Sequence, residues 1–293
     1  MFTKFKMIYA VACFLPAIAL AQSPIDGFMK AKGNGSVTLS YATESYDEVY
    51  LVPEKVDRVP VFGEVDKSVF SLYADYAISN DFMLVLNLPY ITAEGQATQE
   101  SQERNGFENE RNGIQDLSIH GKYRFYTAEL KSSTLDFMGA LGIEFPLGDY
   151  AADEGLQSII AIGNRSTRFN ALGLATYKMN NGFFSTAQLG YSIRSNDVPN
   201  AVISELKLGY AGSGFYVDAY VANQLSSDSG VDILGDGFMG FFPATRVNYT
   251  RAGLNAYVPV SGGVGVSAGA NTYLAGRNLG DATGFYGGLT YSF

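Results

Sequence analysis

Apolar and polar residues alternate along most of the chain, and this alternation predicts β-strands. After the turn sequence SND, residues Phe82, Leu84, Leu86 and Leu88 recur at every second position. A period of two is the pattern of a strand whose two faces meet different surroundings. The segment before the turn alternates in the same way, so the two segments are expected to form a hairpin.

The same pattern predicts strands over the rest of the chain. They cover about residues 36–50, 68–78, 82–92, 114–126, 134–145, 166–179, 183–194, 201–211, 215–224, 246–260, 264–275 and 284–293. Tight turns connect several pairs of these strands, whereas the longest loops lie near 51–67, 93–113, 146–165 and 225–245. An even number of strands of about ten residues, with short turns on one side and longer loops on the other, is typical of an outer-membrane barrel. We therefore predict an all-β fold, a transmembrane antiparallel β-barrel of about 12 strands with periplasmic N- and C-termini.

A soluble β-sandwich is the alternative to the barrel. The segment IQDLSIHGKYRFY has one apolar and one polar face, which by itself fits either fold. Three features favour the barrel: an N-terminal export signal, aromatic residues near the strand ends, and a final strand that closes on an aromatic residue. Aromatic girdles at both membrane interfaces are typical of outer-membrane barrels.

Residues 1–21 have the organisation of a secretory signal peptide. Two lysines precede an apolar run, and Ala19 and Ala21 provide the small residues for cleavage after Ala21. The apolar run is about 14 residues, shorter than the ~20 that a membrane-spanning helix needs. The only cysteine, Cys13, lies inside this segment, so the mature chain has no disulfide. We expect residues 22–293 to form a single outer-membrane β-barrel domain.

Composition and charge agree with this fold. Tyr and Phe number 20 each, Gly 33, and Trp is absent, which suits twisted strands and tight turns. The formal net charge is −9, and removal of the two signal-peptide lysines makes it more negative. A strongly acidic chain argues against nucleic acid as a partner. No other stretch is apolar over the length of a transmembrane helix, so strands must carry any membrane role.

The polar faces of the strands carry charges of both signs. Such residues either line a water-filled path or pair across the barrel and close it. A continuous wet path past Lys122, Arg124 and Arg194 would indicate transport, whereas pairing of these charges across the bore would indicate a structural barrel. The faces of 166–179 and 246–260 are mixed, which leaves their sidedness undetermined. The lumen and selectivity candidates are Asp75, Asp116, His120, Lys122, Arg124, Asp136, Glu144, Arg194, Glu205, Lys207 and Asp218, with Arg251 as a further candidate.

The last strand places Leu289, Tyr291 and Phe293 on one face. We expect these residues to be the signal that the barrel-assembly machinery reads, since terminal strands of outer-membrane barrels end in this way. An apolar edge strand would invite aggregation, and pairing of the last strand with the first removes that edge. Outer-membrane lipid and lipopolysaccharide are the other expected partners.

Three short segments have a familiar pattern: LNLPY (86–90), NGIQDLSIHGKYRF (112–125) and LGIEFPLGDY (141–150). They resemble an outer-membrane barrel family named after the meta-pathway of phenol degradation and described as transporters. Where that family tends to carry glycine before an aspartate, this chain has Gln115 before Asp116. The resemblance implies a barrel in the outer membrane and indicates a substrate only weakly. It covers about residues 80–293 and is carried by LNLPY, NGIQDLSIHGKYRF and LGIEFPLGDY. Channels of the fatty-acid type are the neighbouring possibility, but residues 22–35 are shorter than their plug.

Catalysis and metal binding have little support in the sequence. Ser118 and His120 share a face, as Ser and His do in an outer-membrane phospholipase, but the alternation points them into the lumen without a third partner. We expect no enzyme, no catalytic residue and no cofactor. A lone histidine is also a poor metal site. Asp228, Asp232 and Asp236 do not have calcium-loop spacing, so a solvated loop is favoured over a site for divalent ions or ion-bridged lipopolysaccharide.

These patterns lead to one functional prediction and one alternative. We predict an outer-membrane channel or transporter for the passive or facilitated passage of small molecules, hydrophobic or aromatic ones included. The alternative is a closed structural or surface-interaction barrel that acts through its external loops. The acidic residues 94–113 are expected to be a hydrated external loop. The sequence determines neither the substrate nor the oligomeric state.

Overall fold

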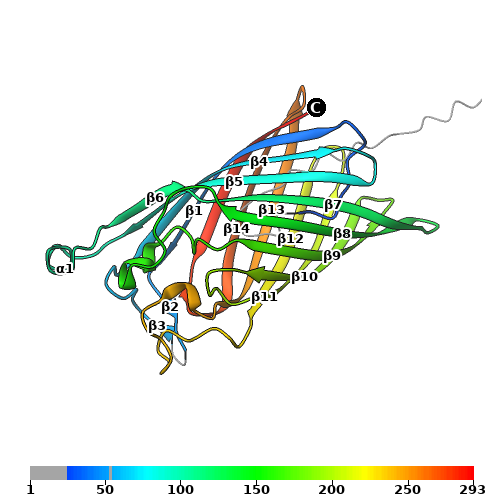
Figure 1. Cartoon of the computed structure of the whole chain (residues 1–293). Coiled ribbons are helices and arrows are strands. Elements are labelled where there is room, and N and C mark those ends of the chain that lie inside the picture. Colours follow the sequence, from blue (N-terminus) through cyan, green and yellow to red (C-terminus); the bar gives the residue numbers. More distant parts are fainter. Residues whose placement is uncertain (1–24, 53–54) are drawn as a thin grey trace, which may run out of the picture.

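The computed structural model describes residues 25–52 and 55–293. The expected signal peptide, residues 1–21, lies outside the described residues. Twelve long antiparallel strands form a closed barrel, with the longer loops gathered at one end (Figure 1). The twelve strands are β1 (Gly35–Tyr46), β4 (Val65–Ala77), β5 (Phe82–Gly95), β7 (Asp116–Glu129), β8 (Ser133–Pro146), β9 (Arg168–Met179), β10 (Phe183–Arg194), β11 (Ala201–Ala211), β12 (Tyr216–Ser226), β13 (Asn248–Ser261), β14 (Val264–Arg277) and β16 (Thr283–Ser292).

Pairing of the first strand with the last closes the barrel. β1 pairs with β16 in antiparallel register from Ser36 opposite Ser292 to Ser45 opposite Thr283. Its other edge pairs with β4. The twelve strands of the barrel, all within the described residues, therefore leave no free edge, which is the condition for strands to cross a membrane. The predicted antiparallel barrel is confirmed.

Strand bounds differ from the prediction mainly where loops begin. β11 has the predicted bounds, whereas β1 ends at Tyr46 instead of continuing to residue 50. The chain leaves the barrel there because β2 (Val49–Tyr50) pairs in a small separate sheet. The other members of that sheet are β3 (Lys55–Val56) and β15 (Leu279–Gly280).

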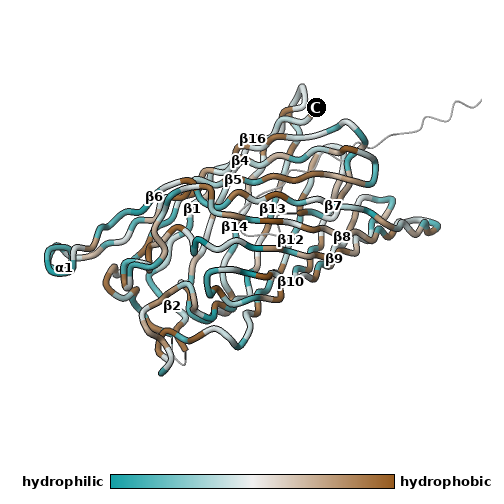
Figure 2. Tube along the Cα trace, viewed as in Figure 1, coloured by the Kyte–Doolittle hydropathy of each residue, from teal (hydrophilic) through white to brown (hydrophobic). Residues whose placement is uncertain are grey.

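Large apolar side chains cover the outer face of the barrel. Leu39, Leu141 and Leu289 keep 64%, 72% and 61% of their surface exposed. Hydropathy changes back and forth along the strands (Figure 2). Exposed and buried positions alternate along the same strands. A soluble protein rarely exposes so wide an apolar band, whereas the hydrocarbon core of a bilayer matches it. The chain is therefore an outer-membrane β-barrel, as predicted. No helix within the described residues is long and apolar enough to span a membrane.

The longer loops fold over one end of the barrel around an apolar cluster, which we call the loop cap. Five of its buried members come from three of the long loops: Val59, Phe62, Ala97, Ile160 and Ile162. η1 (Gly155–Ile160) contributes one of them. The loop cap therefore has a hydrophobic core of its own, which the pattern of strands did not predict.

The acidic residues 94–113, predicted to be a hydrated loop, are more ordered than expected. β6 (Glu110–Ile114) continues the pairing of β5 beyond the barrel rim, and α1 (Gln99–Asn105) closes the hairpin. α1 buries no side chain, and it lies at the tip of a projecting, hydrophilic hairpin (Figure 2). The helix at its tip is exposed, as a loop would be, but the segment is not irregular.

Ion pairs fasten the loop between β12 and β13, which contains η2 (Phe242–Ala244), to the rim of the barrel. Arg277 Nε and Nη2 donate to the two oxygens of Asp232 at 2.7 and 2.5 Å. Asn278 Nδ2 also donates to Asp232, at 2.8 Å. The hydrogen bonds from Arg277 hold the pKa of the Asp232 carboxyl below its usual value. Asp228 pairs with Arg246 at 2.6 Å, so two of the three spaced aspartates already have arginine partners.

We predict that Asp232→Asn exposes residues 227–247 to proteolysis severalfold faster at pH 7, because the amide cannot accept both Arg277 bonds. A carboxyl group whose pKa is lowered by folding stabilises the folded state fully at a pH above its pKa in the unfolded chain, which is roughly 4. This contribution is lost as the pH falls through the lower pKa of the folded state. Wild-type protection should therefore be equal at pH 7 and pH 5. Limited proteolysis with mapping of the cleavage sites measures this. Asp236→Asn, in an exposed position of the same loop, is the control. Equal cleavage of both variants would contradict a specific role for Asp232.

Candidate functional site

The inner face of the barrel carries the charged residues that the alternation placed there. Lys122 and Asp136 each keep 1% of their side-chain surface exposed, although both are charged. Charges this deeply buried need partners, because transfer from water is costly. The predicted candidates share this inner face: Asp75, Asp116, His120, Lys122, Arg124, Asp136, Glu144, Arg194, Glu205, Lys207, Asp218 and Arg251. Their role in selectivity stays a prediction.

Residues 25–34, which we call the plug segment, lie within the barrel at the turn end. The sequence predicted that residues 22–35 are too short for the plug of a fatty-acid-type channel, and this stays a prediction. A short segment nevertheless enters the lumen. A short extended chain suffices because the lumen of a twelve-stranded barrel is narrow. The segment joins the wall where Gly33 N–H donates to the Ala77 carbonyl and Gly35 N–H to the Phe293 carbonyl.

Lys122 holds the first part of the plug segment. Its ammonium donates to Asp26 Oδ1 at 2.8 Å, to the Asp26 carbonyl at 3.1 Å and to the Phe28 carbonyl at 2.6 Å. These three bonds match the three donors of a lysine ammonium. Lys122 therefore anchors the plug segment instead of facing an open wet path.

Lys30 holds the second part of the plug segment through a pair of opposite polarity. Its ammonium lies 2.5 Å from Asp75 Oδ1 and donates to Ser36 Oγ at 2.6 Å. The Ser36 backbone N–H and hydroxyl also donate to Asp75, each at 3.0 Å. In the Lys122 pair the carboxylate, Asp26, belongs to the plug segment. In the Lys30 pair the carboxylate, Asp75, belongs to the wall.

Apolar contacts complete the fit of the plug segment. Ile25 is buried among inward side chains of the wall that include Leu172 and Leu174 of β9. The Phe28 ring lies edge-on to Phe184, with ring centroids 4.9 Å apart. These inward leucines explain why residues 166–179 showed two mixed faces in the sequence.

The backbone of the plug segment passes closest to the barrel wall at Gly27. A Cβ atom at this position would overlap the Thr176 and Thr186 hydroxyls of the wall. Only glycine lets the backbone pass so close to the strands. The segment therefore fits the lumen in one register.

His120 is fully buried in the wall and has a single hydrogen-bond partner in the described part of the chain. Its Nδ1 lies 3.1 Å from Ser118 Oγ, and Nε2 has no partner among those residues. Its ring occupies the space that a side chain at Gly142 would fill on the neighbouring strand. No carboxylate of residues 25–52 and 55–293 hydrogen-bonds to the ring, so the arrangement lacks the third member of a catalytic triad.

Charges near the loop end are only partly paired. Arg168 lies 3.4 Å from Glu144, and the Tyr150 hydroxyl donates to Asp116. Arg194 stands directly opposite Arg168 in the register of β9 and β10. It donates to Gln224 Oε1 at 2.7 Å and pairs with no carboxylate among residues 25–52 and 55–293. The charges near this rim are thus less completely compensated than those at the plug segment.

The remaining candidates pair locally. At the turn end Arg124 lies 2.7 Å from Asp81, and Asp136 pairs with Lys178. Lys207 lies 3.5 Å from Glu205 two residues away. Asp218 accepts hydrogen bonds from Tyr216 at 2.5 Å and Asn255 at 2.7 Å. Most predicted lumen charges therefore pair with neighbours on the wall. Of the three residues expected to line a wet path, Lys122, Arg124 and Arg194, only Lys122 binds the plug segment.

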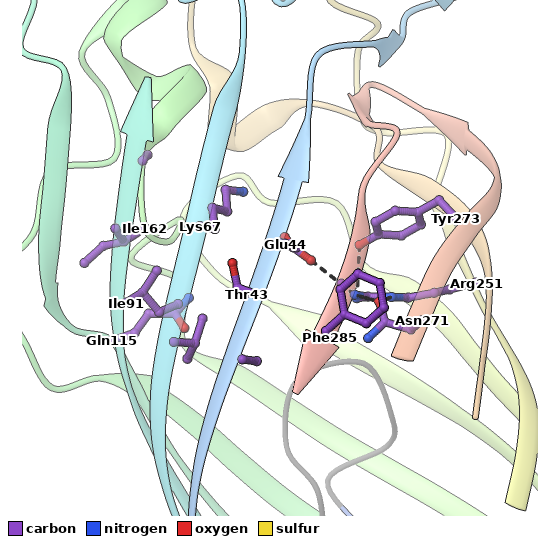
Figure 3. Close-up of a pocket in the computed structure, with 14 residues that line it drawn as sticks. Thr43, Glu44, Lys67, Ile91, Gln115, Ile162, Arg251, Asn271, Tyr273 and Phe285 are labelled. Carbon is purple, nitrogen blue, oxygen red and sulfur yellow. Dashed lines mark hydrogen bonds and ion pairs between the residues drawn. The ribbon is translucent and has the colours of Figure 1, made fainter. Parts of the chain in front are cut away.

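A cavity of about 280 Å³ lies at the loop end of the barrel, below the loop cap. Lys67 and Ile91 come from one side, and Arg251, Asn271 and Tyr273 from the opposite side (Figure 3). Ile162 of the loop cap covers the apolar side. Lys67 was not a predicted site residue, although its inward position in the alternation of β4 was available as a signal.

Within residues 25–52 and 55–293, no three His, Cys, Asp or Glu side chains come together as ligands for a metal ion. The expectation that the chain needs no cofactor and is not an enzyme stays a prediction.

Comparison with known proteins places the chain among outer-membrane barrels. The family described as "Putative MetA-pathway of phenol degradation" matches residues 62–287. The crystal structure of the COG4313 outer membrane channel from Pseudomonas putida F1 superposes with a TM-score of 0.71 at 13% identity, over 92% of this chain and 99% of that chain. This similarity shows a shared fold.

Two further solved structures are more distant. The KdgM porin in complex with disordered oligogalacturonate has a TM-score of 0.46 at 6% identity, over 87% of this chain and 99% of that chain. Outer membrane phospholipase A from Escherichia coli has a TM-score of 0.42 at 9% identity, over 92% and 94%. No curated protein matches the sequence.

We predict that Lys122→Met destabilises the barrel and frees the plug segment, because Asp26 loses its cation. Removal of one partner from a buried pair costs about 3–5 kcal/mol, and the lower end applies because Asp26 retains contact with water. The temperature at which the folded form converts to the slower-migrating unfolded form on electrophoresis measures the change. Lys131→Met, in an exposed turn, is the matched control. An unchanged transition temperature in Lys122→Met would show that the pair does not hold the segment.

Proposed function

Because the chain belongs to the family of the phenol MetA pathway, we propose that it is an outer-membrane channel through which small molecules cross by passive or facilitated passage. The observation that carries the proposal is the plug segment, which fills the lumen through two ion pairs and a few side-chain contacts. None of these contacts is covalent, and in the proposed function the segment leaves the lumen while the strand pairing of the barrel stays intact. A removable plug in a polar lumen is what a gated channel needs.

The proposed passage is directed from the loop cap toward the plug segment. The loop cap and the projecting α1 hairpin would face the outside, and both chain ends the periplasm, as in other outer-membrane barrels with short periplasmic turns. The loop-end cavity, with apolar residues on one side, is where a small hydrophobic or aromatic molecule would first be held. The relative from Pseudomonas putida F1 is described as an outer membrane channel, in keeping with this proposal.

The lipid-facing surface supplies the proposed partners. Leu289, Tyr291 and Phe293 lie on the outer face of the terminal strand and are all more than half exposed. They are therefore available to the barrel-assembly machinery before insertion and to lipid afterwards. The projecting, hydrophilic α1 hairpin would contact lipopolysaccharide.

A closed barrel that acts through its loops is the second candidate. The buried ion pairs of the plug segment and the packed loop cap favour it, since both ends of the lumen are filled in this state. The two functions differ in whether the plug segment leaves.

We predict that Asp26→Asn/Asp75→Asn increases single-channel conductance severalfold over the wild type in a planar bilayer. The two substitutions remove the carboxylates that pair with Lys30 and Lys122. A buried ammonium without a partner is costly, so the state in which the plug segment has left the lumen and Lys30 is in water becomes more favourable. Asp81→Asn removes a carboxylate from the Arg124 pair at the turn end and does not touch the segment, so it is the control.

Each outcome of this measurement distinguishes the two functions. Small steps in the wild type and larger ones in the double variant would support the channel. Silence from both proteins, when electrophoresis shows them folded, would overturn the channel proposal in favour of the closed barrel.

A further inference from the structure

The loop-end cavity has a polar and an apolar part. Glu44, Lys67, Arg251 and Asn271 contribute polar groups, whereas Ile91, Val69 and Ile162 contribute apolar surface (Figure 3). Ligand pockets commonly measure about 300–1,000 Å³ and combine an apolar lining with a few polar groups. At about 280 Å³ the cavity suits a small molecule with one ring or a short chain.

Arg251 is already satisfied by protein groups. Its Nη2 lies 3.1 Å from Glu44 Oε2, its Nε donates to Asn271 Oδ1 at 2.8 Å, and its Nη1 donates to the Tyr273 hydroxyl at 3.3 Å. The guanidinium also lies 4.7 Å from the centre of the Tyr273 ring. This network fixes the polar wall of the cavity and commits the Glu44 carboxylate to Arg251.

Lys67 is left with unused donors. It stands directly opposite Glu44 in the register of β1 and β4, yet the Glu44 carboxylate turns to Arg251. Among the described residues, the Lys67 ammonium donates no hydrogen bond and has no carboxylate within ion-pair distance. The Lys67 nitrogen lies 5.5 Å from the centre of the Tyr46 ring. The cavity thus holds two cations and one carboxylate, and its uncompensated charge is positive.

We propose that this cavity binds a small carboxylate with an apolar body, with the carboxylate on the Lys67 ammonium. The proposal rests on the proposed function, since it names the substrate class of the channel. The apolar body lies against Ile91 and Ile162, where a charged or strongly hydrated group would lose its water. A cation is disfavoured because the single carboxylate already pairs with Arg251. A neutral molecule would leave the Lys67 donors unused.

Binding of benzoate tests the proposal, with benzamide as a neutral analogue of the same shape. Calorimetric titration of the refolded full mature chain, in a neutral sugar-headed detergent at pH 7 and low salt, gives both affinities. We expect benzoate to bind at least tenfold more tightly than benzamide. Lys67→Met should remove that preference, and Lys67→Arg should keep most of it because the charge remains. Lys131→Met, outside the cavity, should bind as the wild type does.

A further variant covers the case in which Lys67→Met does not fold. Glu44→Gln removes the only carboxylate among the cavity side chains named above and is expected to strengthen benzoate binding severalfold. Equal affinity for benzoate and benzamide would overturn the proposal, and so would an unchanged preference in folded Lys67→Met.

Conductance of the same proteins separates this proposal from the channel itself. Wild-type conductance steps that benzoate neither blocks nor alters, together with no heat of binding, would overturn the carboxylate site and leave the channel in place. Benzoate binding to a folded protein that never conducts would support the site while overturning the channel.

Discussion

A backbone amide in the hydrocarbon core of a bilayer has no water to bond with, so every one must find its partner within the protein. Antiparallel pairing of β1 with β16 meets this requirement by leaving no sheet edge open. Closure also fixes the alternation of side chains, because each strand then has one face toward lipid and one toward the lumen. The apolar outer band and the charged inner face of this chain are two results of the same constraint.

Closure of the barrel places many charged side chains in a narrow interior. With twelve strands the lumen is too narrow for all inward charges to keep full hydration, and buried charges need partners. Most find one on the wall, as Asp136 does with Lys178 of the neighbouring strand. Lys122 and Asp75 find theirs on the plug segment, which is why a short piece of chain can hold a position inside the barrel. At the loop end, Lys67 lies directly opposite Glu44 on the neighbouring strand. The Glu44 carboxylate pairs with Arg251 instead, so the Lys67 ammonium is left available.

The strands could be predicted because their period is local, whereas the site depends on contacts between distant residues. Residues 201–211 were predicted with the bounds of β11, since alternation and flanking turns are both visible in the sequence. The plug segment could not be predicted, because Asp26 and Lys122 are far apart in the chain and their pairing leaves no periodic signal. The inward Leu172 and Leu174 were visible as an irregularity in the alternation, but only the position of Ile25 gives it a meaning. The positions of Glu44 and Lys67, directly opposite each other on β1 and β4, would by themselves have suggested an ion pair between them.

The order of charges on the plug segment makes its position specific as well as stable. Asp26 and Lys30 have opposite signs, and each faces the opposite charge on the wall, Lys122 for the first and Asp75 for the second. If the segment shifted so that Lys30 approached Lys122, two ammonium groups would meet in a poorly hydrated space, and repulsion would replace attraction. Gly27 adds a steric condition, because only that position passes the two wall threonines. The wild-type segment therefore has one favourable place within the barrel.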